Sequence, residues 1–129
     1  MTISEKAQEN HACGCNCAQS VLCACGEYTG LDETVARHIA AGFGAGMRCG
    51  EMCGAVSGAI MALGAASDGN GKPAGEVSAQ VKKLTAAFRE KYGYLRCSDL
   101  LRDAKQQRCN EFIGVCAGLA EELLKENKG

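Results

Sequence analysis

Cysteine is the residue type with which this sequence can do the most chemistry. The chain of 129 residues contains ten of them: Cys13, Cys15, Cys17, Cys23, Cys25, Cys49, Cys53, Cys97, Cys109 and Cys116. Thiols act as metal ligands, as redox groups or as small buried hydrophobes. No Cys-x-x-Cys occurs, so the spacing gives no support for a zinc ribbon, a thioredoxin-type active site or covalently attached haem. Soft sulfur ligands select zinc, copper(I) or iron–sulfur clusters.

The segment 42–58 combines small residues with an arginine and two cysteines. Its glycines allow the backbone to curl with its N–H groups pointing inward, a concavity that favours anions. We therefore predict that Gly44, Gly46, Gly50 and Arg48 contribute to cofactor binding. The alternative interpretation is a tight turn between two helices, with the glycines present for clearance and the arginine exposed.

Cys49 and Cys53 flank the start of a helix that we expect to begin at Gly50 or Glu51. The partial positive charge of a helix N-terminus lowers the pKa of nearby thiols, so both positions favour thiolate. In a metal-free redox site, Cys53 would attack a disulfide and Cys49 or Cys17 would resolve the mixed disulfide.

Helical periodicity covers most of the chain, and no strand pattern of period two, no repeat and no domain boundary is visible. We predict one all-α, cysteine-rich redox domain over residues 1–129, a bundle of about five helices. The expected helices cover about 5–26, 32–43, a segment starting near 50, a segment from about 73 to 93, and 109–125. A loop is expected over 68–72 and a short helical turn over 97–101. Three cysteine-bearing helices and this turn can converge on one interior point.

Local patterns refine these helices. Ser4 and Asp32 are candidate N-caps. Val35, Ile39 and Phe43 are spaced by four and predict an apolar stripe.

One helix face carries only small residues. Gly54 and Gly58 lie four residues apart, so another helix can approach closely. The partner helix would come from this chain or from another subunit, which makes a homo-oligomer possible.

Composition narrows the possible partners and the compartment. Hydrophobic residues make up 47% of the chain, and 14 basic residues nearly balance 15 acidic ones. Because no basic stripe interleaves with aromatic residues, we expect no nucleic-acid partner. The N-terminus lacks the apolar core of a signal peptide, and the longest apolar stretch is too short to span a membrane. We therefore expect a cytoplasmic protein without membrane insertion. Because the cytoplasm is reducing, its ten cysteines are not expected to form a disulfide framework.

Five motifs occur in a fixed order along the chain: Asn16–Val21, Gly42–Met47, Gly50–Gly58, Phe88–Leu101 and Cys109–Ile113. This arrangement resembles the C_GCAxxG_C_C family, whose members are described as redox-active proteins with four signature cysteines. The resemblance implies that these four are Cys17, Cys53, Cys97 and Cys109, and it also implies iron–sulfur binding.

Three functions remain open at this point. The first is electron transfer through an iron–sulfur cluster on the four signature cysteines, serving an unidentified redox partner protein. The second is a thiol–disulfide oxidoreductase without a metal. The third is a non-enzymatic binder of zinc or copper, favoured by the accessible thiols expected at Cys13, Cys15, Cys23 and Cys25. The plain alternative is that most cysteines fill an alanine-rich core.

Overall fold

A computed structural model describes residues 1–67, 74–104 and 108–127. This part of the chain contains eight α-helices and no β-strand, so the all-α prediction is confirmed, whereas the expected number of about five helices was too low. The helices are α1 (Ile3–Ala12), α2 (Cys17–Ala24), α3 (Gly26–Thr29), α4 (Glu33–Ala40), α5 (Gly54–Ala66), α6 (Ala74–Tyr92), α7 (Cys97–Ala104) and α8 (Cys109–Asn127). The loop expected over 68–72 lies outside the described residues.

The long first helix expected over 5–26 is divided in two between Ala12 and Cys17, and the short α3 follows. Gly14 has φ of +108°, which a right-handed helix cannot continue. Asn16 then caps α2: its side chain accepts a hydrogen bond from the Gln19 N–H, and the Gln19 side chain accepts one from the Asn16 N–H. The break therefore makes Cys17 the first residue of a new helix.

The predicted cap of the first helix was also displaced. Thr2, rather than Ser4, caps α1, in a reciprocal arrangement with Glu5. Ser4 lies inside the helix, and its hydroxyl donates a 2.7 Å hydrogen bond to the Gly114 carbonyl of α8.

Asp32 caps α4 as expected, but two of the three residues of the predicted apolar stripe do not face the core; the third, Phe43, lies beyond the end of α4 and packs against the core. Val35 is 44% exposed and Ile39 is 49% exposed, whereas Ala36 and Ala40 are buried. The small alanine side chains allow α4 to pack against α2, and this turns the larger residues toward solvent.

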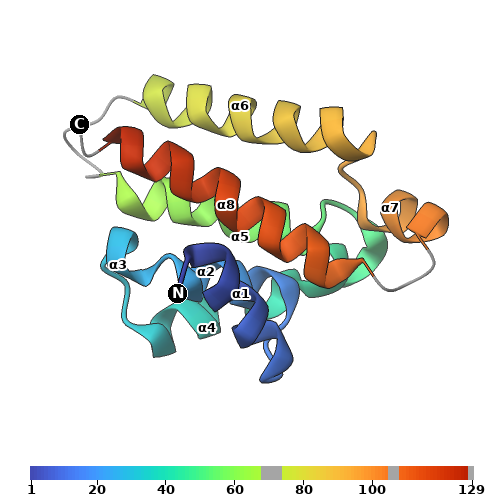
Figure 1. Cartoon of the computed structure of the whole chain (residues 1–129), viewed down its shortest axis with the longest axis horizontal. Coiled ribbons are helices and arrows are strands. Elements are labelled where there is room, and N and C mark those ends of the chain that lie inside the picture. The colour runs from blue at the N-terminus through green and yellow to red at the C-terminus, as the bar shows by residue number, and fades with distance from the viewer. Residues whose placement is uncertain (68–73, 105–107, 128–129) are drawn as a thin grey trace.

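Helices α5 and α8 lie at the centre, with α1 and α2 packed on one side and α6 on the other (Figure 1). The close helix approach expected at Gly54 and Gly58 is confirmed, and the neighbour is α2 of the same chain. A Cβ at Gly58 would lie 2.6 Å from the Ala18 carbonyl oxygen, and one at Gly54 would lie 3.0 Å from Cys17 Cβ. This small-residue contact therefore holds Cys17 beside the start of α5.

An aromatic cluster joins α6 to α8. The rings of Phe88, Tyr92 and Phe112 pack with centroids 4.8 to 5.7 Å apart. Gly93, with φ of +86°, ends α6 as predicted, and the chain turns from there toward α7.

The helix expected from Gly50 or Glu51 begins instead at Gly54. The preceding residues Ala45, Gly46, Met47 and Arg48 all have φ between +53° and +63°, which makes a left-handed turn. Such a turn cannot run directly into a right-handed helix. As a result Cys53 is the N-cap of α5 and lies just outside the helix.

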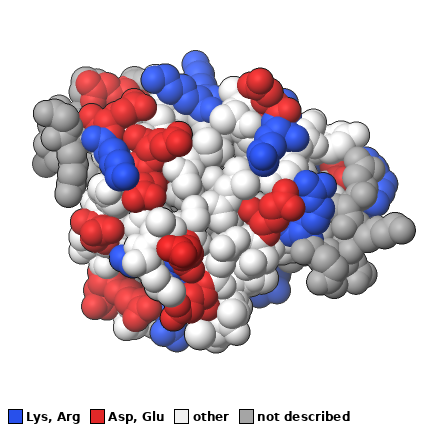
Figure 2. Space-filling view, in the orientation of Figure 1, with Lys and Arg blue, Asp and Glu red and all other residues white. Residues whose placement is uncertain are grey.

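The face shown in Figure 2 mixes acidic and basic side chains around an uncharged central area. Among the helices that the structure describes, none combines the length and apolar character needed to cross a membrane.

Candidate redox site

The four signature cysteines, Cys17, Cys53, Cys97 and Cys109, line one cavity of about 220 Å³. Each lies at the N-terminal end of a different helix. Cys17, Cys97 and Cys109 are the first residues of α2, α7 and α8, and Cys53 caps α5. Because a helix N-terminus carries partial positive charge, the four helix ends together favour negative charge inside the cavity.

Cys53 and Cys97 are placed by a short antiparallel contact between two irregular segments. Met52 and Arg96 form an isolated β-bridge. The Cys53 N–H donates to the Leu95 carbonyl at 2.8 Å, and the Cys97 N–H donates to the Glu51 carbonyl at 2.6 Å. Both cysteines line the cavity, whereas Met52 and Arg96 line a separate groove. This alternation is the one expected for extended, paired backbone.

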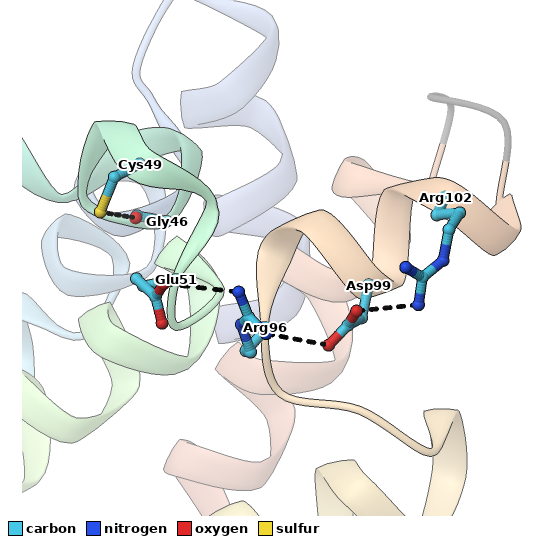
Figure 3. A network of polar contacts seen from close by, with 6 residues as sticks. All are labelled: Gly46, Cys49, Glu51, Arg96, Asp99 and Arg102. Carbon is cyan, nitrogen blue, oxygen red and sulfur yellow. Dashed lines mark hydrogen bonds and ion pairs between the residues drawn. The ribbon is translucent and has the colours of Figure 1, made fainter.

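Charged side chains fasten the start of α7 to the turn before Cys53 (Figure 3). Arg96 lies 3.5 Å from Glu51 and 4.0 Å from Asp99, and Asp99 lies 2.9 Å from Arg102. Such exposed pairs each stabilise a protein by less than about 1 kcal/mol, so their main contribution here is to orient the segment that carries Cys97.

The thiols of Cys17 and Cys109 lie close enough together in the cavity to shift each other's pKa. The Cys17 thiol donates a hydrogen bond to the sulfur of Cys109, and this bond is the main reason that the pKa of Cys109 falls to about 6. The positive charge of His11 lowers it further. The same hydrogen bond, together with burial and the charges of the neighbouring thiolates, raises the pKa of Cys17 well above its ordinary value.

The remaining two thiols resist ionisation. Burial raises the pKa of Cys53 to about 11, even though the N–H groups of Ala55 and Val56 donate to its sulfur. Burial and the charge of Cys109 raise the pKa of Cys97. The expectation that Cys53 would favour thiolate was therefore wrong, because the loss of hydration outweighs the two amide hydrogen bonds.

The rest of the cavity lining combines apolar and polar side chains. Leu100, Leu101 and Phe112 contribute apolar surface, and His11 and Asn16 contribute polar side chains. His11 Nδ1 lies 3.4 Å from the Asn110 side-chain oxygen. No site role was predicted for His11 or Asn16, although Asn16 immediately precedes Cys17 in a recognisable capping pattern.

The predicted cofactor-binding residues divide into two groups. Gly44 and Arg48 line the cavity. Gly46 and Gly50 do not line the cavity but lie against the start of α7. A Cβ at Gly46 would be 2.8 Å from Cys97 Cβ, and one at Gly50 would be 3.1 Å from Ser98 Cβ. These two glycines therefore provide space for the start of α7.

Cys49, expected to act with Cys53, does not line the cavity. Its thiol is exposed and donates to the Gly46 carbonyl at 3.6 Å (Figure 3). Cys25, expected to be accessible, is fully buried. In the described part of the chain, no three or more His, Cys, Asp or Glu side chains form a group that could hold a single metal ion.

A family model described as "Putative redox-active protein (C_GCAxxG_C_C)" matches residues 15–123, a range that includes all four cavity cysteines. The chain belongs to this family. The description of the C_GCAxxG_C_C family indicates a redox-active protein whose chemistry depends on cysteines. No curated protein and no solved structure matches the chain.

Proposed function

We propose that this protein transfers electrons through an iron–sulfur cluster that Cys17, Cys53, Cys97 and Cys109 would hold. One observation carries the proposal: four thiols line a single cavity, and each stands at the N-terminal end of a different helix. Four cysteine ligands are the set that the common two-iron and four-iron clusters require.

The electrostatics of the cavity support a cationic centre between the thiols. The hydrogen bond with Cys109 and burial raise the pKa of Cys17, burial raises the pKa of Cys53 and of Cys97, and the charges of neighbouring thiolates raise all three further. Three of the four thiols therefore resist ionisation while no metal is bound. Iron ions would remove this resistance by binding each sulfur as thiolate. The negative charge that remains on a cluster with four thiolates would be stabilised by the four helix N-termini.

The cavity walls also suit such a group. When bound, an iron–sulfur cluster supplies a centre that gains and loses an electron reversibly. The N–H groups of Ala55 and Val56 donate to the Cys53 sulfur, and hydrogen bonds of this kind tune the reduction potential. Leu100, Leu101 and Phe112 give the cavity apolar walls, and Arg48 adds a positive charge to its lining.

Serine variants of the purified protein test the proposal. Protein prepared under anaerobic conditions, before and after treatment with iron and sulfide, would be analysed for iron, acid-labile sulfide and zinc. We expect iron and sulfide together in the wild-type protein and their loss in Cys97→Ser. Cys49→Ser is the matched control: Cys49 is only four residues from Cys53 in the sequence, but it does not line the cavity. Equal iron and sulfide in both variants, or zinc as the only metal, would contradict the proposal.

The contact between Cys17 and Cys109 favours a second candidate, a metal-free thiol–disulfide oxidoreductase. The sulfur of Cys109 would attack a substrate disulfide and release one substrate thiol. Cys17 would then attack Cys109 of the mixed disulfide, release the second substrate thiol and leave a Cys17–Cys109 disulfide. The sequence instead predicted attack by Cys53 and resolution by Cys49 or Cys17. Burial raises the pKa of Cys53, and Cys49 does not line the cavity, so Cys109 and Cys17 are the better pair.

Disulfide mapping distinguishes the two candidates. The second predicts that metal-free protein treated with a small disulfide yields a Cys17–Cys109 crosslink, detected by mass spectrometry of peptides. The Cys17→Ser variant should instead accumulate the mixed disulfide at Cys109. If Cys109 remains unmodified in both proteins, the second candidate is wrong.

A further inference from the structure

Two further thiols, those of Cys13 and Cys15, lie in the break between α1 and α2. Cys13 and Cys15 line a groove of about 460 Å³, and no residue that lines this groove also lines the four-cysteine cavity. The groove is completed by Asn10, Gly14, Gln19, Glu33 and Arg37. It therefore joins the helix break to α2 and α4.

The backbone holds these two cysteines in a defined turn. The Cys15 N–H donates to the Asn10 carbonyl at 3.1 Å, and the Gly14 N–H donates to the His11 carbonyl at 3.1 Å. Gly14, between the two cysteines, adopts φ of +108°, a conformation that glycine accepts without strain. Cys13 is exposed and Cys15 is half-buried, so an ion in solution can reach both residues.

A third thiol stands close to the groove. Cys23 of α2 is half-buried, and its pKa is raised to about 11 by burial and then by the charges of Cys15 and Glu33. Arg37 acts in the opposite direction. Cys23 does not line the groove itself.

We propose that Cys13 and Cys15 form a binding site for one copper(I) ion, separate from the four-cysteine cavity. Thiolates are soft ligands that select copper(I), and this ion is satisfied by two of them. Zinc in proteins takes four ligands, a larger set than the two thiols of this turn. A copper(I) ion with two thiolates carries one net negative charge, and Arg37 in the groove wall offsets it.

Competition against a chromogenic copper(I) chelator under anaerobic conditions tests this site. We expect the wild-type protein, as purified, to retain one copper(I) ion per chain. The double variant Cys13→Ser, Cys15→Ser should lose this ion while it keeps the iron and sulfide content of the wild type. Cys49→Ser, which removes an exposed thiol elsewhere, should keep the ion.

Two further measurements make the test independent of the four-cysteine cavity. The Cys97→Ser variant should retain the copper(I) ion whether or not the cavity holds a cluster. X-ray absorption at the copper edge should show sulfur neighbours only, in twofold coordination. Retention of copper by the double variant, or its loss in Cys49→Ser or Cys97→Ser, would overturn the proposal.

Discussion

Substitution of Gly58 by alanine should separate helix α2 from α5 and so disturb the four-cysteine cavity. A Cβ at this position would lie 2.6 Å from the Ala18 carbonyl oxygen and 3.1 Å from Ala18 Cα. Both atoms belong to backbone, which cannot rotate away as a side chain can. Real Cβ atoms do not approach within 3.0 Å of such atoms, so the two helices must move apart.

The expected size of the effect follows from two opposing contributions. Overpacking of this kind costs about 1–3 kcal/mol. The higher helix propensity of alanine returns about 1 kcal/mol. Gly64→Ala, in the same helix, is the matched control, because a Cβ there meets nothing within 4 Å. Both variants gain the same helix propensity, so it cancels when their free energies of unfolding are compared. The difference between these free energies should therefore equal the packing cost of about 1–3 kcal/mol.

Urea denaturation followed by circular dichroism measures this difference. Gly64→Ala should unfold at the same or a higher urea concentration than the wild-type protein, and Gly58→Ala at a lower one. Gly58→Ala should also bind less iron, because α2 carries Cys17 and α5 carries Cys53. Equal stability of Gly58→Ala and Gly64→Ala would contradict the close packing of α2 on α5 at Gly58.

Three other predictions concern the left-handed turn, one acidic group and the thiols. Met47 has φ of +60° and is 45% exposed, so Met47→Gly should raise the free energy of unfolding by up to about 1 kcal/mol; a decrease in urea denaturation would contradict this. The Arg108 guanidinium and then the Tyr92 hydroxyl lower the pKa of Glu111 below 4.5. The stability from this group is present above its ordinary pKa and is lost as the pH falls through the lowered value. Wild-type protein should therefore lose more stability on acidification than Glu111→Gln, and parallel curves would refute the assignment. Iodoacetamide should label exposed Cys49 well before buried Cys116 in peptide mass mapping, whereas equal rates would contradict their burial.

The long helices could be predicted because their apolar residues repeat at helical spacing. Leu84 and Phe88 are buried on α6 as that spacing requires, and Ile113 and Cys116 are buried on α8. The break before Cys17 was missed, although Gly14 and the Asn16–Gln19 capping pair are visible in the sequence. Because the residues on both sides of the break have helical periodicity, the segment 5–26 was predicted as one continuous helix.

The left-handed turn before Cys53 could not be predicted in the same way. Ala45, Met47 and Arg48 adopt positive φ, which L-residues rarely do, and their identities carry no signal for it. The turn is held by contacts distant in sequence, among them Gly50 with Ser98 and the bridge between Met52 and Arg96. Only the folded chain supplies these contacts.

The four cavity cysteines were identified through family resemblance rather than through their spacing. Their common feature, a position at a helix N-terminus, depends on the exact ends of four helices. Helix ends are the least predictable part of a sequence analysis, and the start of α5 was displaced by about four residues. His11 reaches the same cavity from α1 because α1 packs on α8, a contact that local sequence does not indicate.

The most direct test of the central claim is the visible absorption spectrum of the anaerobically purified protein, recorded together with iron and acid-labile sulfide per chain. The account predicts a brown protein with iron and sulfide in equal amounts, bleached reversibly by a reductant. A colourless protein that takes up neither iron nor sulfide after reconstitution would contradict an iron–sulfur site at Cys17, Cys53, Cys97 and Cys109.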